Sequence, residues 1–240
     1  MESIPVLIRR FRTAHARGFT LIEMLVVLFI ITLITAIVIT GQSGYNKTLL
    51  LTDTTYGVAL SAREAQSFGL ASRKYGNVQN PGYGLHFDTV TSRYILFADT
   101  NSTLAAPSTC PNASFNATLP SGSPLSKPGN CRYDSGNADG VVSTNTFTRG
   151  FFIKRFCGKD LNNVVTCSTY NPALTSLDLV FTRPNTTTVI SGLINGSLTS
   201  FSCAQIMIQD ASGQANREIR IYSTGQISMI TTNPMDIKCP

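Results

Sequence analysis

Residues 18–39 read GFTLIEMLVVLFIITLITAIVI, and this apolar stretch decides the architecture of the chain. From Phe19 to Ile39 it holds 21 residues, of which 15 are Leu, Ile, Val or Phe and only Glu23 is ionisable. A helix of this length spans roughly 31 Å, about the thickness of a bilayer's hydrocarbon core. Its summed apolar transfer free energy outweighs the ~2.5 to 3.5 kcal/mol that one central carboxylate costs. We therefore expect a membrane-spanning helix over 19–39 despite Glu23.

The residues before this stretch set its orientation. Arg9, Arg10, Arg12 and Arg17 make the leader basic, which predicts that it stays in the cytoplasm while the rest of the chain is exported. A secretory signal peptide would need a small-residue cleavage site after the apolar run, and residues 40–43, TGQS, offer none. An ordinary membrane anchor would accept the composition but would require neither the glycine nor the acid of this segment.

The hexapeptide GFTLIE, residues 18–23, resembles the processing signal of type IV prepilins. The resemblance implies that a membrane-bound prepilin peptidase cuts after Gly18 and methylates the new amino group of Phe19. It also implies that Glu23 pairs with the terminal amine of a neighbouring subunit during assembly. The partners that follow are other pilin or pseudopilin subunits, an inner-membrane assembly platform and, before assembly, membrane lipid.

The remaining sequence predicts one head domain on a helical stalk. We expect a leader at 1–18, a transmembrane and assembly helix at 19–39, an amphipathic continuation at 40–72 and a globular β-rich head at 73–240. Gly41 and Gly44 favour a bend or a locally melted turn between the two helical parts. From Tyr45 to Leu70 the helical spacing returns, with a predicted core face that includes Leu51, Val58, Ala62 and Ala65.

Strand patterns dominate the head, so the predicted fold class is α+β, a long helix packed on an antiparallel sheet domain. Alternating apolar residues and turn residues predict strands at 83–87, 93–97, 150–156, 163–167, 176–181, 202–209, 218–222 and 226–230. We expect the first two to form a hairpin and the last three a meander. Residues 99–130 are rich in Ser, Thr, Asn and Pro and predict a long surface loop.

Six cysteines follow the apolar stretch, on its exported side. An even number in an oxidising compartment predicts up to three disulfides, although six cysteines allow 15 connectivities. The favoured pairing is sequential, namely Cys110 with Cys131, Cys157 with Cys167, and Cys203 with Cys239. The second of these pairs is the best supported, because it flanks a predicted hairpin. No Cys-x-x-Cys spacing occurs, which argues against a zinc site or a redox dithiol.

Charge and local motifs give little support for a bound ligand, whether DNA or Ca²⁺. The formal charge is +6, and half of it lies in the leader. Arg217 and Arg220, with other basic residues, are the candidate ligand-binding residues for DNA, but the turn at 225–228 lacks the two arginines of the Gly-Arg-x-Arg motif found in DNA-uptake relatives. The turn at 134–140 has oxygen donors spaced for Ca²⁺, yet a solvated turn is the preferred interpretation.

Catalysis has little support either, and we expect no enzyme, no cofactor and no bound metal. Besides His15 in the leader the chain has only His86, which we expect at a barrel rim or at the surface. A Ser or Cys nucleophile would have no other imidazole as its base.

Downstream segments resemble one branch of the family, the GspH/FimT-type minor pseudopilins and minor pilins. The matching segments are 59–65, 82–87, 94–99, 132–136 and 219–221. The resemblance implies a structural minor subunit of a type II secretion or type IV pilus fibre, held by one span in the bacterial inner membrane with its head in the periplasm before it enters the fibre. The alternatives are a DNA-uptake or adhesive minor pilin whose head binds a ligand, and a major pilin.

Overall fold

The structure is a computed structural model that describes residues 18–71, 73–101, 104–121, 123, 125–136, 139–184, 186–213 and 215–230, without the side chains of 40–45. The leader arginines, His15 and the last ten residues with Cys239 lie outside this set.

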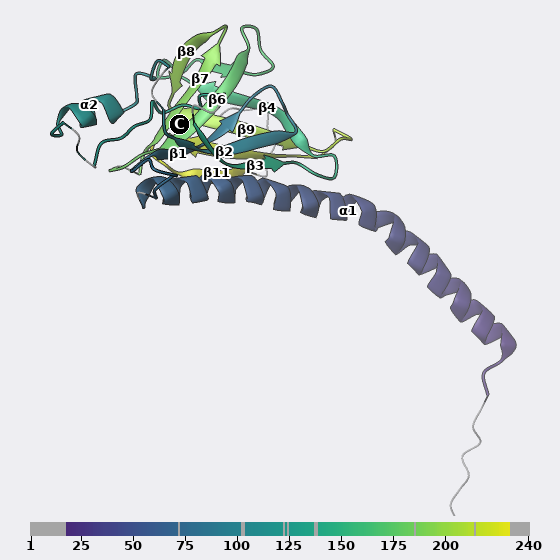
Figure 1. Cartoon of the computed structure of the whole chain (residues 1–240). Helices are drawn as coiled ribbons and strands as arrows, with labels where there is room; N and C mark the ends of the chain where they lie inside the picture. The colour runs from purple at the N-terminus through teal and green to yellow at the C-terminus, as the bar shows by residue number, and fades with distance from the viewer. Residues whose placement is uncertain are drawn as a thin grey trace, which may run out of the picture. The chain divides into compact units, whose positions relative to one another are not determined.

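The described chain holds two helices and eleven strands, and it divides into two compact units between Tyr45 and Asn46. Figure 1 labels both helices and most of the strands. In chain order the elements are α1 (Leu21–Leu70), β1 (Gly82–Phe87), β2 (Arg93–Asp99), α2 (Asn112–Ala117), β3 (Gly140–Thr146), β4 (Phe152–Lys159), β5 (Val165–Cys167), β6 (Leu174–Phe181), β7 (Thr188–Ile194), β8 (Ser197–Phe201), β9 (Cys203–Gln209), β10 (Asn216–Tyr222) and β11 (Ile227–Ile230).

Helix α1 is continuous over its 50 residues. Its backbone remains helical through Gly41 and Gly44, so the predicted melted turn is wrong. Each glycine costs a helix about 1 kcal/mol relative to alanine, and the helical residues on both sides offset that cost.

The part of α1 in the second unit is amphipathic, as its spacing predicts. Leu51, Val58, Ala62 and Ala65 are buried, whereas the charged residues at 63 and 64 are exposed. At Gly69 the helix comes so close to β6 that an added Cβ would collide with the carbonyl oxygen of Phe181. Small residues therefore let this helix pack closely against the strands.

The strands form two antiparallel sheets, which confirms the predicted α+β fold class. The six-stranded sheet has the order β3-β2-β1-β6-β7-β8, and the five-stranded sheet has the order β11-β10-β9-β4-β5. The predicted β1-β2 hairpin and the β9-β10-β11 meander are both present. One core joins the inner faces of both sheets to α1, with Leu85, Phe156, Leu179 and Ile206 among its buried side chains.

Three strands are not predicted by the sequence patterns. β3 is a largely polar edge strand, and β7 and β8 form a hairpin that closes the other edge of the six-stranded sheet. The hairpin turns at Asn195 and Gly196, both with positive φ, which is the turn chemistry that Asn-Gly favours.

The segment between β2 and β3 lies largely at the surface, as its composition predicts, but it is more ordered than a loop. It contains α2, and Cys131 packs with Ile95, Phe97, Val180 and Val189 in a second apolar cluster. The β2 residues of this cluster point away from the main core, because neighbouring strand residues point to opposite faces. The segment therefore covers part of the outer face of the six-stranded sheet.

Two disulfides lie within the described residues. They join Cys110 to Cys131 and Cys157 to Cys167, which are two of the three pairs in the sequential pairing. Cys203 is not a free thiol either, and the partner that the sequential pairing gives it, Cys239, lies outside the described residues.

Candidate functional site

The predicted processing site lies just before α1. Gly18 and Phe19 are exposed and precede the first helical residue, Leu21. A peptidase requires an accessible backbone that is free of helical hydrogen bonds, and both residues meet this condition. The local structure is therefore compatible with cleavage between them.

Thr20 and Glu23 define the beginning of the helix. The backbone N–H of Glu23 donates to Oγ1 of Thr20 at 3.3 Å, and Thr-x-x-Glu is the sequence of a capping box. The carboxylate of Glu23 lies in the first turn, where it interacts favourably with the helix dipole. The same residue is exposed in the isolated chain and is available to a partner.

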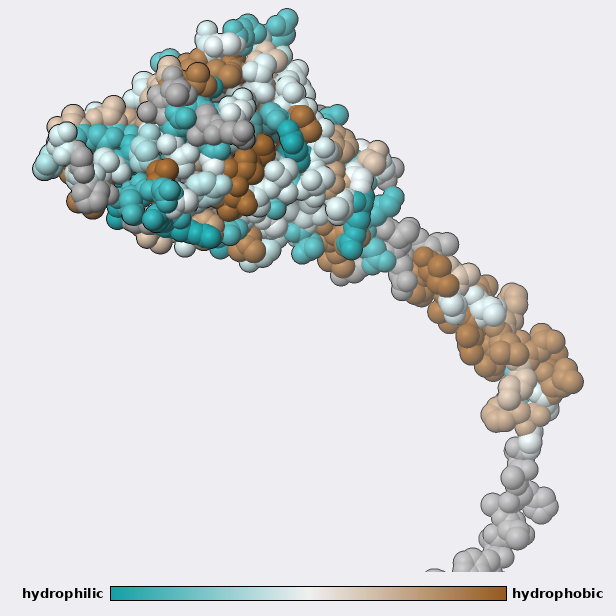
Figure 2. All heavy atoms as spheres, viewed as in Figure 1, coloured by the Kyte–Doolittle hydropathy of each residue, from teal (hydrophilic) through white to brown (hydrophobic). Residues whose placement is uncertain are grey.

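The first part of α1 is apolar on all sides and has no cover within its own unit. Leu21–Ile39 is long and apolar enough to cross a membrane, and none of it is buried. The corresponding helix surface is predominantly brown in Figure 2, the colour of hydrophobic residues. A helix that is hydrophobic all round requires lipid or other helices around it.

Comparison with known proteins assigns this N-terminal segment. Residues 13–39 match the prokaryotic N-terminal methylation motif, so the chain carries the signal of type IV pilins. Comparison with curated proteins and with solved structures gives no significant match. The match covers the start of the chain and leaves the head without an assigned relative.

The structure does not bring the two candidate ligand-binding arginines together. Arg217 donates from Nε to Oγ1 of Thr52 at 3.3 Å, on the side of β10 that faces α1. Arg220 donates from Nε to Oε1 of Glu218. Because the two arginines are three residues apart on one strand, their side chains point to opposite faces. A DNA site built on this pair stays a prediction from charge.

In the turn at 134–140, carboxylate oxygens accept hydrogen bonds from backbone N–H groups. Asp139 accepts N–H bonds from Thr100 at 2.8 Å and from Asn101 at 3.0 Å, and a third from Asp134 at 2.7 Å. Asp99 accepts two more from residues 130 and 131. Burial raises the pKa of Asp139 to about 6 and the pKa of Asp99 well above its usual value. Among the described residues no group of three or more His, Cys, Asp or Glu side chains is placed to hold a metal ion.

We expect His86 at a barrel rim or at the surface, and in the structure it is a partly buried residue of strand β1. Its Nδ1 lies 2.6 Å from Oδ1 of the buried Asp178, and its ring centroid lies 4.5 Å from that of Tyr133. The His86–Asp178 pair bridges the neighbouring strands β1 and β6. These contacts give the histidine a structural role.

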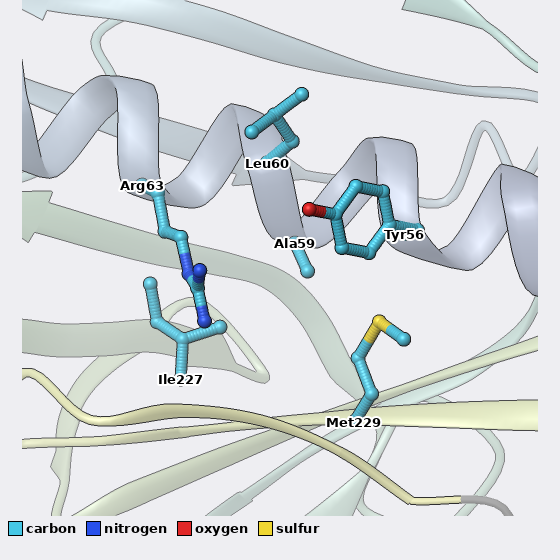
Figure 3. A pocket seen from close by; sticks show the side chains of 6 residues that line it. All are labelled: Tyr56, Ala59, Leu60, Arg63, Ile227 and Met229. Atoms are coloured by element: carbon cyan, nitrogen blue, oxygen red, sulfur yellow. The ribbon is translucent and has the colours of Figure 1, made fainter.

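A hollow of about 200 Å³ lies between α1 and the edge strand β11 (Figure 3). Tyr56, Ala59, Leu60 and Arg63 line it from the helix, and Ile227 and Met229 line it from the strand. The sequence patterns do not indicate this hollow, because it depends on how the last strand lies beside the helix.

Proposed function

We propose that this chain is a minor pilin or pseudopilin, a structural subunit that prepilin peptidase cuts between Gly18 and Phe19. The observation that carries the proposal is the methylation motif at 13–39, which coincides with an apolar helix that nothing in its own unit covers. The long disulfide-bonded segment between β2 and β3 supports a specialised subunit over a major one.

In this proposal the apolar helix lies first in the membrane and then in the fibre. Before assembly it spans the inner membrane, with the head in the periplasm. In the fibre it exchanges lipid contacts for contacts with the helices of neighbouring subunits. The same surface is buried in both states, which explains why it lacks a polar face.

Glu23 sets the axial register in this proposal. A carboxylate among apolar helices is costly unless an opposite charge compensates it. The methylated amine of Phe19 on a neighbouring subunit supplies that charge, because both groups lie near the beginning of the helix. One register satisfies the pair, and other registers leave both charges unpaired.

Crosslinking in the assembled fibre tests the proposal. A photoreactive residue at Phe29 or at Ile34, both exposed in the isolated chain, should capture the corresponding helix of another pilin-like subunit. The control is the same probe in a Gly18→Asp chain. This chain offers no cleavable glycine, so it should capture no helix of another subunit. Copy number in purified fibres separates a minor from a major subunit. Capture of membrane lipid alone in both chains would contradict the proposal.

A further inference from the structure

Lys127 lies in the segment between β2 and β3, and hydrogen bonds of its backbone hold it in place. Its N–H donates to Oδ1 of Asn116 at 2.8 Å, and its carbonyl oxygen accepts from Nδ2 of the same residue at 2.8 Å. This two-point attachment to α2 sets the direction in which the lysine side chain leaves the backbone.

The ammonium group of Lys127 is buried without a hydrogen-bond acceptor. The residue is 3% exposed, and its Nζ has no hydrogen-bond partner among the described residues. The Nζ atom lies 4.2 Å from the centroid of the Phe115 ring. A cation–π contact replaces only part of the hydration that a buried ammonium loses.

A second cation lines the same cavity. Arg183, which follows β6, donates from Nη2 to Oδ1 of Asn80 at 2.7 Å. The cavity measures about 160 Å³ and is lined by Phe115, Leu125, Lys127, Arg183 and Pro184. In the part of the chain that the structure describes, no carboxylate forms an ion pair with either cation.

The charge of the lysine depends on this environment. Burial, and then the charge of Arg183, lower the pKa of Lys127 to about 8. The lysine is therefore still mostly charged at pH 7, and Arg183 adds a second cationic side chain to the lining of the cavity.

We propose that this cavity binds an oxyanion, a carboxylate or a phosphate group, between Lys127 and Arg183. The anion accepts hydrogen bonds from the ammonium and from the guanidinium, which removes the repulsion between the two cations. Phe115 and Leu125 contact the apolar part next to the anionic group. The ligand class is thus a small anion with an apolar neighbour, and the site is independent of how the N-terminal helix assembles.

Calorimetric titration of the full-length protein in detergent micelles tests the site. Sodium phosphate and sodium acetate are titrated separately, so the two sources of an oxyanion are distinguished. We expect at least one to bind at pH 7, and we expect Lys127→Met to weaken that binding roughly tenfold or more. Raising the pH above about 8 should weaken it too, because the ammonium loses its proton.

Two further variants keep the test independent of folding. Lys154→Gln removes an exposed lysine and should bind as the unchanged protein does. Arg183→Gln alters a partly buried residue and should weaken binding while the unfolding temperature stays near that of the unchanged protein. Absence of binding for both anions, or equal affinity in the Lys127→Met protein, would overturn the proposal.

Discussion

At the residue scale, the proposed role of Glu23 in assembly stands against the cost of a carboxylate in the membrane. Replacing it by alanine would remove the proposed partner of a neighbouring amine and would make the helix more apolar. We predict that Glu23→Ala inserts into the membrane normally and enters fibres at a severely reduced level. Fractionation of membranes measures insertion, and analysis of sheared fibres measures incorporation. Glu64→Ala, which removes an exposed acid from the same helix, is the control, and normal incorporation of the Glu23 variant would contradict the prediction.

Asp139 links the stability of the head to pH. Burial raises the pKa of its carboxyl to about 6, so the folded state binds more protons than the unfolded state between the two pKa values. The free energy of unfolding should therefore fall, by on the order of 1 to 3 kcal/mol, as the pH rises from about 5 to about 7.5. Denaturant unfolding at several pH values measures this slope. A free energy that rises over the same interval would show that the sign is wrong.

At the element scale, the contact between α1 and β6 depends on a glycine. Gly69→Ala would place a Cβ against the carbonyl oxygen of Phe181, so we predict a loss of roughly 1 to 3 kcal/mol in unfolding free energy. Gly57→Ala, on the exposed side of the same helix with no atom near its Cβ, should gain about 0.5 to 1 kcal/mol. Thermal unfolding of both proteins gives the comparison, and equal effects would contradict close packing at Gly69.

The Cys110–Cys131 disulfide fixes the segment that covers the six-stranded sheet. Replacing both cysteines by alanine should cost about 2 to 4 kcal/mol and make the segment between β2 and β3 cleavable by protease. The double replacement of Cys157 and Cys167, which join β4 to β5, is the control and should leave this segment protected. Limited proteolysis with mass analysis reads out the cleavage sites, and equal protection in all proteins would contradict the role of the first disulfide.

Much of the element order could be predicted because local patterns agree with the tertiary contacts. The alternating apolar residues of β6, β9 and β10 and the spaced apolar residues of α1 lie in the main core, although β6 and β9 are buried on their other faces too. β3 has no such pattern, because an edge strand needs few apolar residues. The Asn195-Gly196 pair is the local signal that could have located the β7-β8 hairpin. The cavity around Lys127 depends on long-range packing, so no local pattern indicates it.

At the scale of the whole molecule, two units with different surfaces share one helix. The first presents apolar side chains on every side, whereas the second buries its apolar residues in its own core. The second unit can therefore be stable by itself, and the first must find lipid or other helices. This division is what the proposed passage from membrane to fibre requires.

The mass of the N-terminal peptide of the mature protein decides whether the chain is processed as a pilin. Protein purified from cells that contain prepilin peptidase should begin at Phe19 and carry one additional methyl group on its α-amino nitrogen. A Gly18→Asp chain should retain residues 1–18. A mature chain that begins at any other residue, or that keeps its leader beside an active peptidase, would show that the chain is not a processed pilin.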